Sequence, residues 1–116
     1  MTQIWTRRAY DKPGPQDGQR ILVDRIWPRG MSKDDLQLDA WMKDIAPSDD
    51  LRRWFGHDRD KWDAFRTRYA QELRDKPGTV GALRDRIAAG RVTLIYGAKD
   101  KTHNNAAALK AYLEET

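Results

Sequence analysis

A group of charged and aromatic residues directly follows the first strongly apolar stretch of the chain. Residues 21–23 are aliphatic and mostly β-branched, a run that predicts a strand buried on both faces. Pro28 and Gly30 then end the strand and predict a loop. The loop carries the side chains with chemistry: Asp24, Arg25, Trp27 and Arg29. Guanidinium groups grip phosphate or carboxylate with paired donors, so this loop points to an anion-binding site.

A second apolar stretch, residues 91–96, also ends in polar residues. Residues 97–101 predict a turn, and Thr102 is expected to cap a final helix. The free amides and the dipole of a helix start favour an anion. The side chains expected at this second strand end are Tyr96, Lys99, Thr102, His103, Asn104 and Asn105. The alternative is an ordinary capped helix with solvated lysines.

Both strand ends are expected to open into one crevice. If the two strands are parallel neighbours, the side chains at their carboxyl ends meet there. Arg25 and Arg29 would then clamp an anion, and Trp27 and Tyr96 would shape the pocket. Asp24 is expected to be a structural partner whose pKa a neighbouring arginine keeps low.

The chain contains two histidines, His57 and His103, and either could act as a general acid or base. His103 is the stronger candidate because it lies beside the predicted crevice, while His57 would reach it from a neighbouring loop. Two histidines without a third ligand at suitable spacing predict no metal site. The sequence also lacks a P-loop, a GxGxxG fingerprint and a GxSxG elbow, so no cofactor is predicted.

The remaining chain supplies elements that would position these groups. Short strands are predicted at 4–7, 20–23 and 91–96, and an ordered loop at 10–18. Helices are predicted to begin near Ser32, Ser48, either Asp58 or Asp60, Thr79 and Thr102. Residues 36–42 fit either a strand or an extended crossing segment. The pattern predicts one α/β domain over residues 1–116, with a short, mainly parallel sheet of about three to five strands flanked by four to five helices.

Composition narrows the classes of protein further. The chain has 116 residues, a formal charge of +4 and no cysteine, which excludes disulfides and thiolate chemistry. The positive balance favours anionic partners, including nucleic acid, although no block of like charges appears. No secretory signal and no apolar run of membrane-spanning length is present, so a cytoplasmic protein without a membrane partner is expected.

The same residues resemble a known family. The string Val23–Gly30, the segment Trp54-Phe55-Gly56-His57-Asp58 and the closing stretch from Thr93 to Asn105 resemble the YeaO-like branch of domain of unknown function 488. The resemblance implies a cytoplasmic α/β domain. Longer members carry a Cys-His-Arg cluster after the last strand, whereas this chain has His103-Asn104-Asn105. Their thiol chemistry is therefore not expected here.

Three functions remain open from the sequence. The first is a domain that binds a small anionic ligand in the crevice, with a possible enzymatic step. The second is a nucleic-acid-binding module, in which Trp27 stacks on bases among the arginines. The third is a ligand-free interaction or regulatory domain, in which Arg25 and Arg29 only support the fold.

Overall fold

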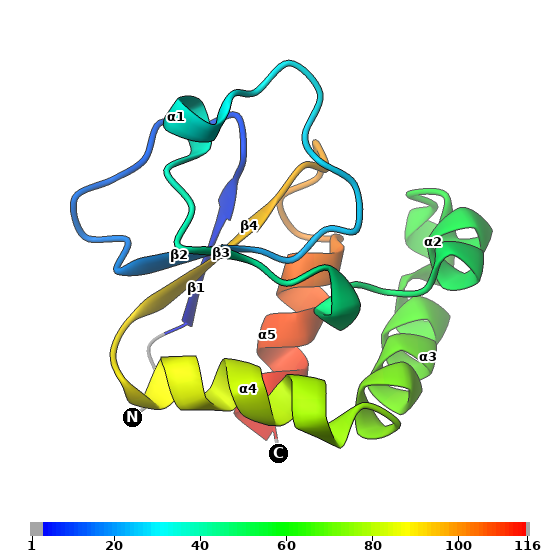
Figure 1. Ribbon diagram of the computed structural model, residues 1–116. Coiled ribbons are helices and arrows are strands. Elements are labelled where there is room, and N and C mark those ends of the chain that lie inside the picture. The colour runs from blue at the N-terminus through cyan, green and yellow to red at the C-terminus, as the bar shows by residue number, and fades with distance from the viewer. Residues whose placement is uncertain (1–3, 116) are drawn as a thin grey trace.

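Strand β4 (Val92–Tyr96) is the centre of the structure, and all five of its residues are buried. The computed structural model describes residues 4–115. The strands β1 (Ile4–Arg8), β2 (Gln19–Leu22) and β3 (Ala40–Trp41) complete a sheet of order β1-β4-β2-β3 (Figure 1). Every pairing is parallel. A strand with neighbours on both sides and helices or loops over both faces requires a continuous apolar run, which explains its composition.

Residues 4–115 also contain five α-helices and two 3-10 turns, which lie between β2 and β4 except for the last helix, after β4. The helices are α1 (Lys33–Leu36), α2 (Asp49–Phe55), α3 (Trp62–Arg74), α4 (Pro77–Ala88) and α5 (Asn105–Glu115), and the turns are Lys43–Ile45 and Arg59–Lys61. The predicted α/β class, with a short parallel sheet and four to five helices, is confirmed. None of these helices has the length and hydropathy needed to span a bilayer.

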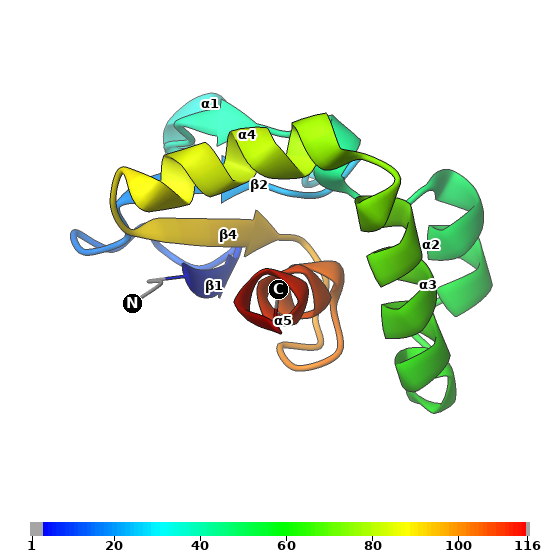
Figure 2. The ribbon, with the colours of Figure 1, turned by 90° about the horizontal axis from the view of Figure 1, so that it is seen from below.

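The two faces of the sheet are covered differently. Val92, Leu94 and Tyr96 of β4 point into the main core, which α3, α4 and α5 share. The alternate residue Ile95 belongs to a smaller cluster on the other face, formed with Leu36 of α1 and the loop that carries Trp27. Figure 2 shows α5 beside the β1–β4 pair, while α2 and α3 stand next to each other at the side of the sheet.

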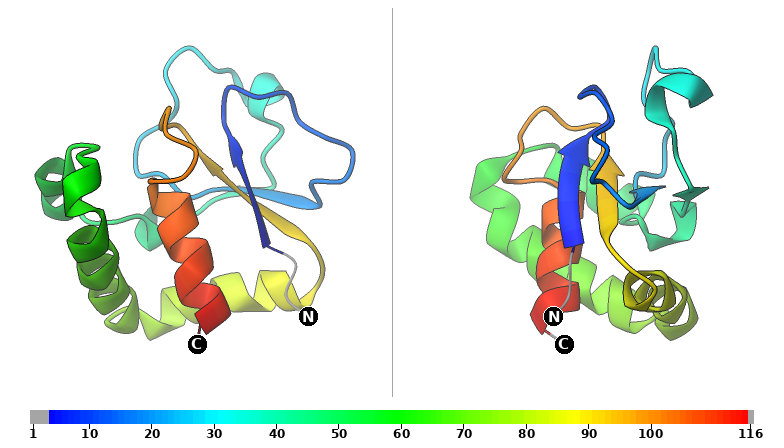
Figure 3. Two further views of the ribbon diagram at one scale, coloured as in Figure 1. Left: turned by 180° about the vertical axis from the view of Figure 1, so that it is seen from behind. Right: turned by 90° about the vertical axis from the view of Figure 1, so that its left-hand side faces the viewer.

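The carboxyl ends of β2 and β4 are neighbours, as the sequence predicted. Ile21 pairs with Leu94, and the Val23 amide donates to the Ile95 carbonyl at 3.0 Å, one step beyond β2. The amide of Ala9, after β1, likewise donates to the Tyr96 carbonyl at 2.7 Å. The loops after these strands therefore leave the sheet at one edge, and α5 begins near this edge and runs back along the sheet (Figure 3).

The loop at 10–18 is ordered by a buried ion pair. Asp17 and Arg20 are 1% and 4% exposed, and their side chains lie 2.5 Å apart. The Asp17 carboxylate also accepts from the Gly14 amide at 2.9 Å, and its backbone carbonyl accepts from the Thr93 hydroxyl. Gly18 has φ +66°, and a Cβ there would lie 2.3 Å from the Arg91 carbonyl, so only glycine fits.

The structure corrects two predicted helix starts and decides between the two interpretations of residues 36–42. Helix α4 begins at Pro77, two residues before Thr79, because proline suits the first position of a helix. Thr102 does not cap α5: the Asn104 side chain does, accepting from the Ala107 amide at 2.8 Å. Within residues 36–42 only Ala40–Trp41 forms a strand, because Gln37 adopts a left-handed conformation with φ +47°.

Candidate functional site

A cleft of about 390 Å³ lies at the edge of the sheet where β2 and β4 end. Its walls come from the loop after β2, the loop after β4, the first residue of α5, and α2 with the residues on either side of it. Apolar side chains form much of the surface, including Trp27, Pro47, Phe55 and Phe65. A concave, largely apolar surface with a few polar groups is typical of small-molecule sites.

Asp24 ties the two strand ends together on the floor of the cleft. Its Oδ2 accepts from the Gly97 amide at 2.8 Å, and its Oδ1 accepts from the Asn105 side chain at 2.9 Å. Asp24 forms no ion pair within residues 4–115. The predicted arginine partner is therefore wrong, and neutral donors hold this carboxylate in place.

The environment of Asp24 raises the pKa of its carboxyl group above 3.8. Burial is the main cause, because removal from water disfavours the charged form. The hydrogen bonds from Asn105 and Gly97, and the charges of His57 and Arg52, act in the opposite direction and only partly offset it. The prediction of a low pKa is wrong because no guanidinium pairs with this group.

Asn105 offers the cleft an acceptor and no donor. Its Nδ2 donates to the Val23 carbonyl at 3.0 Å and to Asp24 at 2.9 Å, so both amide hydrogens are used. Both of these partners are acceptors, which fixes the orientation of the amide. The Asn105 Oδ1 has no partner in the described part of the chain.

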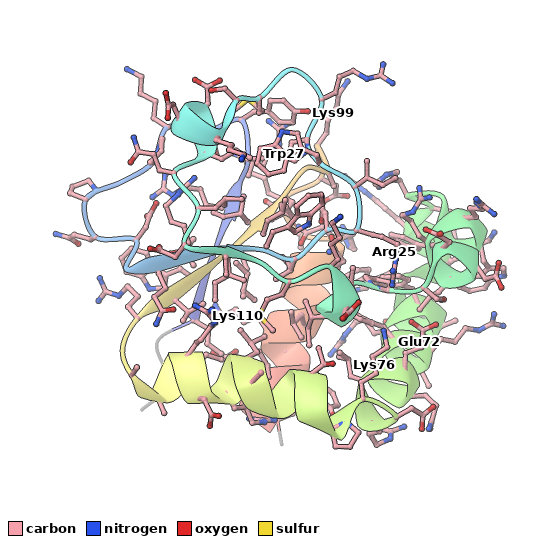
Figure 4. All side chains as sticks on the ribbon, in the orientation of Figure 1. Arg25, Trp27, Glu72, Lys76, Lys99 and Lys110 are labelled. Atoms are coloured by element: carbon pink, nitrogen blue, oxygen red, sulfur yellow. The ribbon has the colours of Figure 1, made fainter. Side chains whose placement is uncertain are left out.

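Three arginines line the same cleft from the opposite side. Arg25 follows β2 and points towards α2 (Figure 4), where its Nε lies 3.4 Å from the Pro47 carbonyl and 3.9 Å from the Asp49 carboxylate. Arg52 also contacts Asp49, at 3.5 Å. Arg53 makes no hydrogen bond or ion pair with any residue from 4 to 115. The Asp49 carboxylate thus contacts two guanidinium groups, and the Arg53 guanidinium has no partner within residues 4–115.

Helix α2 is held in position by hydrogen bonds at its N-terminal end and by apolar contacts with α3. Ser48 caps it by accepting from the Leu51 amide, and the Ser48 hydroxyl donates to Glu72 of α3 at 2.6 Å. Phe55 stacks on Phe65 of α3, with ring centroids 4.3 Å apart. The helix ends at Gly56, as the sequence predicted, and places the two arginines in its last turn.

The structure brings together about half of the predicted site residues. Those that line the cleft are Asp24, Arg25, Trp27, His57, Asn104 and Asn105. Those that do not are Arg29, Tyr96, Lys99, Thr102 and His103. Tyr96 is 2% exposed and belongs to the core, while Arg29, Lys99 and Thr102 are exposed.

The histidine at the cleft is His57 and not His103, which the sequence had favoured. His103 packs edge-on against Trp62 at 5.2 Å, and its Nδ1 lies 3.1 Å from the Asp100 carboxylate. His57 lines the cleft and is exposed, in a left-handed conformation with φ +58°. The residue after the helix-ending Gly56 is therefore the histidine that faces the site.

The start of α5 has fewer free donors than predicted. Asp100 accepts from the amides of Thr102 and His103, both at 2.9 Å, and these bonds hold its pKa well below the ordinary value. The Gly97 amide is bound to Asp24, and the Ala107 amide to Asn104. The protein's own side chains therefore occupy four of the amides around this helix start, those of Gly97, Thr102, His103 and Ala107.

The sequence alone did not identify Arg52, Arg53 and the phenylalanines as parts of the site. Leu51 and Phe55 predicted a helix with one apolar face, and two arginines in its last turn were visible. Only the packing of α2 on α3 places this turn opposite the strand ends. Across residues 4–115, no cluster of three or more acidic, histidine or cysteine side chains is arranged to hold a metal ion.

Comparison with known proteins identifies relatives over nearly the whole chain. The family model described as "Inactive DUF488-N3 subclade" matches residues 3–116. The uncharacterized protein YeaO of Escherichia coli is 42% identical over 110 residues, which cover 95% of this chain and 96% of YeaO. An uncharacterized protein of Mycobacterium tuberculosis, Rv3073c, is 39% identical over 112 residues, covering 97% and 94%. No solved structure matches significantly.

Proposed function

This chain belongs to the DUF488 family, in its inactive DUF488-N3 subclade, and from that premise we propose that its cleft binds a small anionic ligand carrying a phosphate or carboxylate group. The observation that carries the proposal is the set of three guanidinium groups, Arg25, Arg52 and Arg53, around one concave surface. Arginine suits this task because its planar fork presents paired donors to phosphate and carboxylate oxygens.

The balance of charge around the cleft supports the proposal. Asp49 is the acid that contacts Arg25 and Arg52, and it is half exposed, with a side-chain accessibility of 51%. Such exposed pairs contribute little and are easily exchanged for a better acceptor. An anion at this rim would meet Arg53 without displacing any partner.

The size and polarity of the cleft favour a small molecule. A volume of about 390 Å³ is at the lower end of the range for small-ligand sites. Trp27, Phe55 and Phe65 would cover the apolar part of the ligand. The description of the subclade as inactive supports binding without chemical conversion, and the absence of cysteine is consistent with it.

The test is a titration of ¹⁵N-labelled protein with inorganic phosphate and with ethyl phosphate, followed by amide chemical shifts. We expect shifts at Gly97, Gly56 and the residues of α2, and an affinity reduced about fivefold or more in Arg53→Gln. Arg74→Gln, an exposed arginine at the end of α3, is the matched control and should bind like the wild type.

Two results would count against this function. The first is the absence of shifts around the cleft at millimolar ligand. The second is equal affinity in Arg53→Gln and the wild type. Tight binding of single-stranded DNA or RNA that weakens steeply with salt would instead favour the nucleic-acid module. Turnover of a phosphate ester that is lost in His57→Gln would show that the site is an enzyme.

A further inference from the structure

The two ends of the cleft have opposite hydrogen-bonding character. The end formed by α2 and Arg25 presents guanidinium donors. The floor presents the Asp24 carboxylate, whose two oxygens each accept one internal bond and retain further acceptor capacity. Beside it lies the Asn105 Oδ1, which has no partner among the described residues. The side chains of the floor therefore offer two kinds of acceptor, the Asp24 carboxylate and the Asn105 Oδ1.

Two side-chain acceptors make the floor unsuited to the anionic group itself. A phosphate or carboxylate placed there would face the Asp24 carboxylate and the Asn105 carbonyl oxygen, and the Gly97 amide and the Asn105 amide group already donate to protein acceptors. Partly buried acceptors are stabilised by a donor that replaces the water they lose. The anion belongs at the rim, and a donor belongs at the floor.

We propose that the cleft selects ligands that combine an anionic group with an N–H donor, either a primary amine or the amino edge of a nucleobase, with Asp24 and Asn105 receiving the donor. This inference rests on the proposed function, because the arginine rim must hold the anionic end. Asp24 is partly buried and forms no ion pair within residues 4–115, although the charges of His57 and Arg52 act on it from a distance. A ligand ammonium or amino group would supply a direct partner.

The experiment compares two pairs of probes that differ in the donor. O-phosphoethanolamine is compared with ethyl phosphate, and adenosine monophosphate with ribose 5-phosphate, by the same amide-shift titration. An added ammonium group weakens attraction to an arginine rim. A preference for O-phosphoethanolamine therefore requires a favourable site for the ammonium group elsewhere in the cleft, and the nucleotide pair shows whether a base is favoured as well. The Asp24 variant then separates hydrogen bonding to the floor from contacts with Asp49 or with the aromatic side chains.

We expect at least one amine-bearing or base-bearing probe to bind about tenfold more tightly than its partner. In Asp24→Asn, which keeps the shape of the side chain, this preference should fall to less than about threefold while the partner probe still binds. Asp44→Asn, on the exposed turn before α2, is the control and should keep the full preference.

The outcomes separate this inference from the proposed function. If ethyl phosphate and ribose 5-phosphate bind at least as tightly as their partners, the donor preference is wrong and the anion site stands. If no probe binds, both proposals fail. If Asp24→Asn does not fold, wild-type binding of adenosine monophosphate is compared with that of purine riboside 5′-monophosphate, which stacks similarly but lacks the amino group. Equal affinity of these two nucleotides would contradict the donor preference.

Discussion

The Oδ2 of Asp24 accepts a hydrogen bond from the backbone amide of Gly97 at 2.8 Å, across 73 residues of sequence. This bond joins the loops that leave β2 and β4, and a Cβ at position 97 would lie only 3.2 Å from the same oxygen. The contact explains why a carboxylate stands at the floor of a cleft whose rim is basic. The burial of this carboxylate leads to a prediction about its pKa.

The pKa of Asp24 should lie above 3.8 and that of Asp100 below it. Burial raises the first, and the amides of His103 and Thr102 lower the second. The stabilisation linked to Asp24 is therefore complete at pH below 3.8 and is lost as the pH rises through its raised pKa. Asp100 behaves oppositely: its contribution is present above 3.8 and is lost as the pH falls through its depressed pKa.

Carboxyl ¹³C shifts recorded against pH measure both groups directly. The Gly97 amide should follow the Asp24 midpoint, and the His103 amide should follow Asp100. A midpoint for Asp24 at or below 3.8 would contradict the proposed environment of this residue.

Asp17→Ala should lower the free energy of unfolding by about 3–5 kcal/mol, because it leaves the buried Arg20 guanidinium without its partner. Burial alone would raise the pKa of Asp17, but the Gly14 amide, Arg20 and Arg7 together lower it. The stabilisation from Asp17 is thus present above pH 3.8 and is lost as the pH falls through the depressed pKa.

Urea unfolding at neutral and at acidic pH checks this prediction. Asp44→Ala serves as the exposed control and should change stability by less than about 0.5 kcal/mol. An Asp17→Ala protein as stable as the wild type at neutral pH would show that the ion pair does not hold the loop at 10–18.

Ser48→Ala should destabilise the protein by about 1–2 kcal/mol, because it removes the cap of α2 and a hydrogen bond to the Glu72 carboxylate. Thr67→Ala removes an exposed hydroxyl from α3 and should have a smaller effect. Thermal unfolding compares the two variants. Equal stability of Ser48→Ala and Thr67→Ala would show that Ser48 does not stabilise the packing of α2 on α3.

Arg53→Gln should bind phosphate more weakly than Arg29→Gln does, while the two variants should have similar melting temperatures. Arg53 lines the cleft without an internal partner, so its loss should weaken phosphate binding without lowering the melting temperature. Arg29 is exposed and outside the cleft, so its replacement should change neither quantity by much. A fall in melting temperature for both variants, with unchanged binding, would favour the ligand-free interaction domain.

The sequence predicted those parts of the fold that local chemistry determines. The largely apolar run of β4, the serine caps of α1 and α2 and the glycine that ends α2 could be predicted because each depends on near neighbours in the chain. The rule for parallel strand ends predicted that the loops after β2 and β4 meet, but not the contact between Asp24 and Gly97. These parts required no knowledge of how the helices pack.

The errors concern side chains with several possible partners. Asn105 was expected to donate to a ligand, but the Val23 carbonyl and the Asp24 carboxylate take both of its hydrogens. His103 was preferred over His57, but Asp100 holds its ring outside the cleft. Sequence spacing does not decide between competing partners, because distances across loops depend on the tertiary structure.

The bond between Ser48 and Glu72 means that the basic and the acidic sides of the cleft are carried by different elements. Arg52 and Arg53 stand on α2, which Ser48 joins to α3, whereas Asp24 and Asn105 join the end of β2 to the start of α5. A molecule in contact with both sides would connect α2 directly to the strand ends. Its binding should slow hydrogen exchange in α2 more than in the fully buried strand β4.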